Sequence, residues 1–129
     1  MKVENIHFEN MARGFYTPAK KVDVGNAHLI FVSGIQHPLD EAGDVADTAS
    51  QTLFVFQDIE QILNLAGAGL DDVIKAVIYV TDMNDFDIVS PIRAEYFKNS
   101  KPVSTLVEVS KTAQPGAKIE VEVTAIIEK

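Results

Sequence analysis

Hydrophobic and polar positions recur with two different periods along the chain, and each period predicts one type of secondary structure. Residues 46–66 carry apolar side chains at intervals of three, four or seven positions, which is the spacing of one helical stripe. The members of this stripe are Ala46, Ala49, Leu53, Phe56, Leu63 and Ala66. We expect Asp44 or Thr48 to cap the start of this long helix. Gly67 and Gly69 should end it, because glycine favours the turn that closes a helix.

A second, shorter helix is predicted after residue 90. Proline breaks a helix interior because it lacks an N–H group and clashes with the preceding turn. We therefore place Pro91 at the first helical position and Ser90 at the cap. Ile92, Tyr96 and Phe97 then form the buried side of the helix.

Four segments are predicted to form β-strands. Residues 28–33 form a short apolar run, and residues 103–109 are β-favouring and follow a proline. Residues 73–81 and 118–127 alternate between two faces, with Ile74 expected on the buried face of the first. The order strand, helix, strand, helix, strand, strand predicts an α+β fold in which one mixed sheet carries both helices on one face. The other face holds apolar and small residues, so we expect another subunit to cover it.

The composition is typical of a single globular domain. At 129 residues with 47% hydrophobic side chains, residues 1–129 are expected to form a single domain with its own core. The chain has no cysteine, which excludes disulfides, thiolate metal sites and cysteine nucleophiles. Its three histidines show no metal-ligand spacing, so no metal site is expected.

Charge and hydropathy limit the expected location and partners. The N-terminal residues are polar and do not resemble a signal peptide, and no run approaches the roughly 18 apolar residues that span a bilayer. We therefore expect a cytoplasmic protein that binds no membrane. The formal net charge of −8 would repel a phosphate backbone, so nucleic acid is not expected as a partner.

Four segments, in this order and spacing, resemble the RidA/YjgF family. They are GFYTPA at 14–19, FVSG at 31–34, TDMNDF at 81–86, and PVSTLVEV at 102–109 running on to KIEVE at 118–122. The resemblance implies a chorismate-mutase-like fold and a homotrimer whose three sheets form a central barrel. It also implies ligand clefts between subunits. There, reactive enamines and imines such as 2-aminoacrylate and 2-iminobutanoate would be hydrolysed to keto acids and ammonia, with no metal or organic cofactor.

The resemblance also assigns roles to individual residues. Glu120 matches the family's carboxylate in the last strand, which orients the attacking water. Tyr16 matches a tyrosine that lines the cleft. Ser33 and Gly34 match a Ser-Gly pair whose backbone approaches the ligand, and Ser90 stands where an asparagine is frequent.

Four of these residues also have a purely structural interpretation. Glu120 fits a strand carboxylate that faces solvent or pairs with Lys118. Tyr16 fits loop or core packing, Gly34 fits a turn, and Ser90 fits a helix cap. The sequence leaves both interpretations open for every one of them.

One position departs from the family pattern. The deaminase branch carries a Pro-x-Arg-Ser/Thr motif, which here is PVST at 102–105, so Ser104 stands in place of the arginine. Losing a bidentate, charge-assisted pair removes roughly 2–5 kcal/mol of binding to a substrate carboxylate. Arg93 is the first candidate to replace that cation, followed by Lys101 and Arg13, although each also fits an ordinary surface charge.

Three functions remain open on this basis. The first is an imine or enamine hydrolase with altered substrate choice, in which Glu120 is catalytic and Tyr16 and Ser33 line the cleft. The second is a non-catalytic trimer that binds a metabolite, such as a small imino or keto acid, in the same clefts. The third is an endoribonuclease or translation inhibitor, which the acidic charge disfavours.

Overall fold

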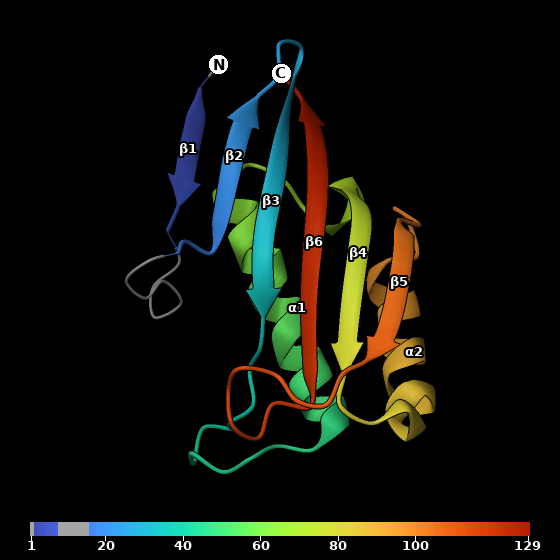
Figure 1. The fold of residues 1–129 in the computed structure, drawn as a ribbon. Helices are drawn as coiled ribbons and strands as arrows, with labels where there is room; N and C mark the ends of the chain where they lie inside the picture. The colour runs from blue at the N-terminus through green and yellow to red at the C-terminus, as the bar shows by residue number, and fades with distance from the viewer. Residues whose placement is uncertain (1, 8–15) are drawn as a thin grey trace.

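A mixed sheet of six strands carries two α-helices on one face in the computed structural model, which describes residues 2–7 and 16–129 (Figure 1). The strand order is β1-β2-β3-β6-β4-β5, and only β4 and β5 pair in parallel. The strands are β1 (Val3–Ile6), β2 (Ala19–Asp23), β3 (Ala27–Ile35), β4 (Val73–Val80), β5 (Val103–Glu108) and β6 (Ile119–Glu128). The helices are α1 (Thr48–Leu65) and α2 (Phe86–Tyr96). The 3₁₀ turn η1 (Leu70–Asp72) follows α1 and leads into β4, and the 3₁₀ turn η2 (Met83–Asp85) follows β4 and leads into α2. The predicted α+β arrangement is confirmed.

Strands β1 and β2 were not predicted from the sequence. Their sequences, VENI and AKKVD, are short and rich in charged residues, so they lack the apolar alternation that marks the other strands. They lie at one edge of the sheet, where a row of side chains can remain in water. Only Ile6 and Ala19, which are directly paired, are buried.

The core lies between the sheet and the helices. Phe56 and Leu63, two members of the predicted stripe on α1, are fully buried against the sheet, and so is Ile59 beside them. Leu53, which the prediction placed in the same stripe, is instead 39% exposed. Phe56 stacks on Tyr96 of α2 with 4.8 Å between ring centroids and meets Phe97 edge-on at 5.3 Å. These aromatic contacts join the two helices. Within the described residues, no helix is long and apolar enough to cross a membrane.

The start of α1 differs from the prediction. Asp47 is the N-cap, and its carboxylate accepts a hydrogen bond from the backbone N–H of Ser50 at 2.7 Å. Asp44 lies earlier in the preceding loop, and Thr48 is already helical, with its hydroxyl donating to Asp85 at 2.8 Å. The prediction of Asp44 or Thr48 as the cap is therefore wrong. The predicted end is confirmed at Gly67, which follows the helix with φ +85°.

The start of α2 also differs. The helix begins at Phe86, because η2 leads directly into it and already turns the chain there. Pro91 consequently lies inside the helix, and Ser90 is a helical residue rather than the cap. The missing N–H leaves the carbonyl of Asp87 without its helical donor. Both Asp87 and Pro91 are exposed, so water can satisfy that carbonyl.

The assignment of Ile74 to the buried face of β4 is also wrong. A register shift between Val73 and Lys75 turns Val73 into the core and leaves Ile74 44% exposed. Beyond the shift, Ala76, Ile78 and Val80 are buried as predicted.

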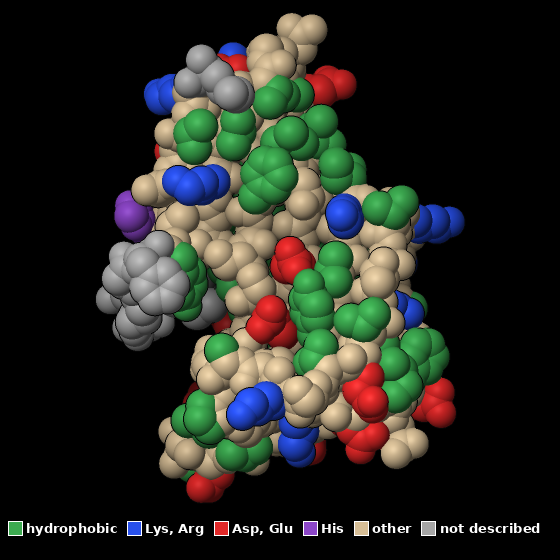
Figure 2. Space-filling model, viewed as in Figure 1, with side chains coloured by type: hydrophobic (Ala, Val, Ile, Leu, Met, Phe, Trp, Pro, Cys, Tyr) green, Lys and Arg blue, Asp and Glu red, His purple; other side chains and the backbone are tan. Residues whose placement is uncertain are grey.

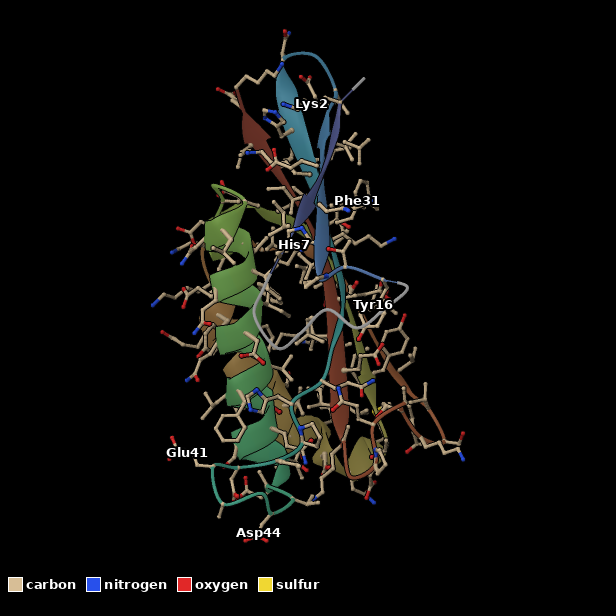
Figure 3. The ribbon with its side chains drawn as sticks, turned by 90° about the vertical axis from the view of Figure 1, so that its left-hand side faces the viewer. Lys2, His7, Tyr16, Phe31, Glu41 and Asp44 are labelled. Atoms are coloured by element: carbon tan, nitrogen blue, oxygen red, sulfur yellow. The ribbon has the colours of Figure 1, made fainter. Side chains whose placement is uncertain are left out.

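The face of the sheet opposite the helices is uncovered in one chain, and we call it the open face. Figure 2 shows hydrophobic side chains gathered over it, with acidic side chains near its middle. Phe31 and Val103 are 47% and 70% exposed there. Figure 3 shows α1 on one side of the sheet and Phe31 and Tyr16 on the other. An apolar surface of this kind is typical of a face that contacts another protein.

Candidate functional site

Glu120 lies on the open face because β6 alternates strictly around it. Its neighbours Ile119 and Val121 are fully buried against the helices, so the carboxylate projects to the opposite side. The side chain of Gln36, which is itself buried, donates a hydrogen bond from Nε2 to Glu120 Oε1. Gln36 Oε1 in turn accepts from the backbone N–H of Gln114 at 3.0 Å. The carboxylate is therefore held by Gln36 rather than paired with Lys118.

Gly34 lies directly against this carboxylate. A Cβ added at position 34 would come within 2.8 Å of the Glu120 carboxyl carbon, closer than real Cβ contacts allow. Strand β3 shifts its register between Val32 and Ile35, at the point where Gly34 approaches β6. The two family-matched residues Gly34 and Glu120 are thus brought together, and a side chain at position 34 would displace the Glu120 carboxylate from its present position.

A tyrosine that the sequence analysis did not single out joins the same face. Tyr79 of β4 is the cross-strand partner of Glu120, and its hydroxyl donates to Glu122 Oε1 at 2.5 Å. This hydrogen bond, together with burial and the nearby carboxylates, raises the pKa of Tyr79 to about 12. In the sequence, alternation with Ile78 and Val80 indicates that Tyr79 lies on the face opposite the core. Only the fold shows that Tyr79 lies beside Glu120 and Glu122.

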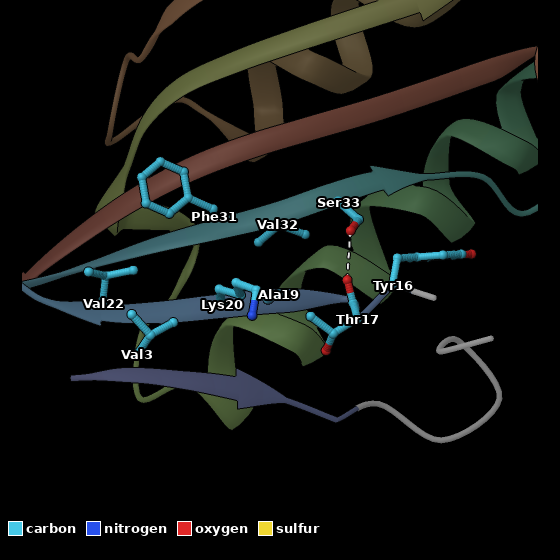
Figure 4. A pocket seen from close by; sticks show the side chains of 9 residues that line it. All are labelled: Val3, Tyr16, Thr17, Ala19, Lys20, Val22, Phe31, Val32 and Ser33. Carbon is cyan, nitrogen blue, oxygen red and sulfur yellow. Dashed lines mark hydrogen bonds between the residues drawn. The ribbon is translucent and has the colours of Figure 1, made fainter. Parts of the chain in front are cut away.

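Tyr16 and Ser33 line a groove of about 660 Å³ on the open face, beside β1 and β2 (Figure 4). The groove is mainly apolar, and its lining comprises Val3, Tyr16, Thr17, Ala19, Lys20, Val22, Phe31, Val32 and Ser33. The Ser33 hydroxyl donates to the carbonyl of Thr17 at 2.7 Å, and its backbone N–H donates to Pro18. Ser33 therefore ties β3 to the segment that carries Tyr16, whose side chain is 47% exposed.

A second group of predicted site residues gathers around Arg93 of α2. One guanidinium nitrogen lies 3.5 Å from Ser104 Oγ and another lies 3.4 Å from Ser90 Oγ. The guanidinium carbon sits 5.9 Å from the centroid of the Phe86 ring. Ser104 pairs with the buried Ala76 on β4, so its side chain is on the helix side of the sheet, under α2. The structure thus places Arg93 beside Ser104, where the sequence made it the first candidate to replace the missing cation, and brings Ser90 into the same group.

The residues around Glu120 and the residues around Arg93 do not meet within one chain. Ser104 pairs with Ala76 and Glu120 pairs with Tyr79, so the two residues are offset by three positions along β4 and by two strands across the sheet. Strand geometry puts their Cα atoms about 14 Å apart. Their side chains also leave opposite faces of the sheet.

The remaining candidates lie elsewhere. Lys101 is exposed, has φ +47°, and its side chain forms no hydrogen bond or ion pair within the described residues. Arg13 lies outside the described residues. One of the three histidines, His37, follows the Ser33–Gly34 segment, and its Nδ1 lies 2.7 Å from Asp58 Oδ2 on α1. Burial raises the pKa of Asp58, and the contact with His37 opposes that rise. In the part of the chain that the structure describes, no group of three His, Asp or Glu side chains is placed to hold a metal ion.

Comparison with known proteins identifies the family. The family model described as endoribonuclease L-PSP matches residues 9–127. The 3-aminoacrylate deaminase RutC of Acinetobacter baylyi is 38% identical over 109 residues, which cover 82% of each chain. The chain belongs to the RidA/YjgF family. Another member, the bovine 2-iminobutanoate/2-iminopropanoate deaminase, is 33% identical over 89% of this chain and 82% of its own.

The fold of the family agrees with the computed structure. The crystal structure of a Rid family protein of unknown function from Yersinia pestis, YyfA, superposes with a TM-score of 0.84. It is 32% identical, and the match covers 98% of this chain and 100% of that one. Relatives within the RidA/YjgF family thus carry deaminase, endoribonuclease and unassigned names. Family membership therefore leaves the activity of this chain to be argued from its own residues.

Proposed function

We propose that this protein hydrolyses small imines and enamines that carry a carboxylate, and that Glu120 is its catalytic residue. The carboxylate of Glu120, held by Gln36 and packed on Gly34, is the observation that carries the proposal. A carboxylate fixed in one orientation on the open face can position a water molecule for attack. The deaminase names of two relatives support the same reaction class.

The reaction needs only water as its second reactant. An enamine first takes a proton on carbon to become the iminium ion, which is the protonated imine. Water held by Glu120 then attacks the imine carbon and gives one proton to the carboxylate as the C–O bond forms and the C=N double bond becomes single. Glu120 returns that proton to nitrogen, ammonia leaves, and the hydroxyl releases its proton to solvent as the carbonyl forms. The products are a keto acid, or an aldehyde acid for a 3-aminoacrylate, and ammonia.

We propose that the cleft forms between copies of a homotrimer. Phe31 and Val103 on the open face and the apolar groove beside Tyr16 offer a surface for another copy. A second copy is also needed if Arg93 and Ser104 are to face Glu120, since one chain holds them on opposite faces of its sheet. The absence of cysteine fits a reducing compartment, and we propose a cytoplasmic location on that ground.

A second candidate function is binding without turnover in the same cleft. It is favoured by Ser104, which supplies a hydroxyl where the deaminase branch of the family has a charged arginine. In this case small keto acids would stabilise the protein against heat, but no ammonia would be released from an imine.

Turnover of an imine separates the two functions. An amino-acid oxidase acting on 2-aminobutyrate supplies 2-iminobutanoate, and semicarbazide traps the imine that has not been hydrolysed. Addition of the protein should lower the semicarbazone yield, and Glu120→Gln should abolish the effect, since losing a general base costs about 10²- to 10⁴-fold. An unchanged yield with the wild-type protein would reject the hydrolase and leave the binding protein.

A further inference from the structure

We propose that Arg93, on helix α2, is the residue that binds the substrate carboxylate. This inference rests on the proposed function and names the chemical class that the cleft selects. The substrates in the names of the two relatives, 3-aminoacrylate and 2-iminobutanoate, share a carboxylate on a very small carbon skeleton. A site for such molecules needs a cation, because the carboxylate is the main group through which so small a molecule can be bound.

Arg93 has the free donors that this task requires. A guanidinium carries five N–H donors in a planar fork that matches a carboxylate. The two serine contacts of Arg93, at 3.5 and 3.4 Å, are at the long limit of hydrogen bonding and engage two of its nitrogens only weakly. Within the described residues Arg93 forms no ion pair with any carboxylate. Its charge therefore remains available to a ligand.

The surroundings of Arg93 hold it in place without neutralising it. The ring centroid of Phe86, which is also on α2, lies 5.9 Å from the guanidinium carbon of Arg93. Ser90 of α2 and Ser104 of β5 lie next to the guanidinium nitrogens. An arginine at position 104 would bring a second guanidinium against the first. Serine there removes that repulsion and adds a hydroxyl that can bond to the same ligand. Ser104 and Arg93 thus form one anion site whose charge comes from the helix rather than the strand.

Other cations on the chain are less suited to this role. Lys20 donates to Asn5 at 2.7 Å, and Lys98 pairs with Glu95 at 2.8 Å. Lys101 is adjacent in sequence to β5, but within the described residues its side chain forms no hydrogen bond with Ser104 or Arg93. Lys101→Gln is consequently the matched control, since it removes a positive charge from the same part of the chain.

Calorimetric binding of 2-oxobutanoate and its neutral amide, 2-oxobutanamide, tests the inference without requiring turnover. The wild-type protein should prefer the acid. Arg93→Gln should weaken acid binding at least about tenfold with little change for the amide, as expected when one charge-assisted pair is lost. Arg93→Lys should bind the acid with intermediate affinity, and Lys101→Gln should bind it like the wild type. Circular dichroism checks that every variant is folded.

A charge swap completes the test. The double variant Arg93→Gln/Ser104→Arg should regain the preference for the acid, because it returns one guanidinium to the site. Unchanged acid binding in Arg93→Gln, alongside imine hydrolysis by the wild type, would overturn the role of Arg93 and leave the proposed function standing. Acid binding through Arg93 without hydrolysis would support the role of Arg93 and reject the hydrolase. A wild-type protein that neither binds the acid nor hydrolyses the imine would overturn both.

Discussion

Gly34 lies against the carboxylate of Glu120, so closely that a Cβ at position 34 would come within 2.8 Å of the carboxyl carbon. Gln36, two residues further along the chain, donates to the same carboxylate. The orientation of Glu120 is therefore set both by the close approach of Gly34 on strand β3 and by the buried amide of Gln36. Its function should be sensitive to changes that leave Glu120 itself in place.

Gly34→Ala is expected to displace Glu120. The added methyl group should cost about 1–3 kcal/mol of stability through overpacking and lower imine hydrolysis about 10- to 100-fold by moving the carboxylate. Urea denaturation and the semicarbazone assay measure the two effects. In a Glu120→Ala background the clash is gone, so the same substitution should be nearly neutral for stability. An equal stability cost in both backgrounds would mean that Gly34 is needed for another reason.

Tyr79 should titrate far above an ordinary tyrosine. Its hydrogen bond to Glu122 raises its pKa to about 12 from 10.0, because ionisation would place a phenolate beside a carboxylate. The folded-state pKa is the higher one, so this bond contributes stability below pH 10 that is lost as the pH rises through about 12. Ultraviolet difference titration against Tyr79→Phe isolates its ionisation. In Glu122→Gln the midpoint should move back toward 10.0; a midpoint that stays put would exclude the bond as the cause.

Removing the helix cap should destabilise the protein only where Asp47 is ionised. The carboxylate accepts the Ser50 backbone N–H, which lowers the pKa of Asp47 below 3.8. Its contribution is therefore present above that pH and is lost as the pH falls through the folded-state value. Urea midpoints of Asp47→Ala should fall below wild type at neutral pH and converge with it in acid. Asp44→Ala, which removes a loop carboxylate that caps nothing, should follow the wild type throughout.

The aromatic contact between the helices should carry a large part of the stability. Phe56 is fully buried and touches both Tyr96 and Phe97, so Phe56→Ala is expected to cost about 3–5 kcal/mol. Leu65→Ala on the same helix removes a side chain that is 57% exposed and should change stability by less than about 0.5 kcal/mol. Denaturant titration at fixed protein concentration compares them. Similar costs for the two variants would contradict the assignment of this face of α1 to the core.

The parts of the fold that the sequence predicted are those that bury one regular face. Helix α1 and strands β4 and β6 were marked by apolar periodicity, β3 by a continuous apolar run, and β5 by β-favouring residues after a proline, and the structure confirms all five elements. Strands β1 and β2 were not predicted because their charged side chains remain in water at the sheet edge and give no apolar pattern. The predicted start of α2 was wrong because Pro91 was placed at the first helical position. A proline can occupy a helix interior when the carbonyl that it leaves unpaired is exposed.

The site was predictable only as far as single positions carry a signal. Resemblance pointed to Glu120, Gly34 and Ser104 one by one. Gln36 lies 84 positions from Glu120 and Tyr79 lies 43 positions from Glu122, so no local pattern connects them. The approach of Arg93 to Ser104 depends on how α2 crosses β5, which is set by packing of the whole helix layer.

The claim that one cleft takes Glu120 from one copy and Arg93 from another has a direct test. Glu120→Gln and Arg93→Gln chains, each impaired alone, are unfolded together in equal amounts, refolded, and assayed for 2-iminobutanoate hydrolysis. Random assembly of a cyclic trimer should give about one quarter of the clefts with both wild-type residues, so activity should rise to about one quarter of the wild-type value. Activity no higher than the average of the two variants would contradict the claim, because a site within one chain gains nothing from mixing.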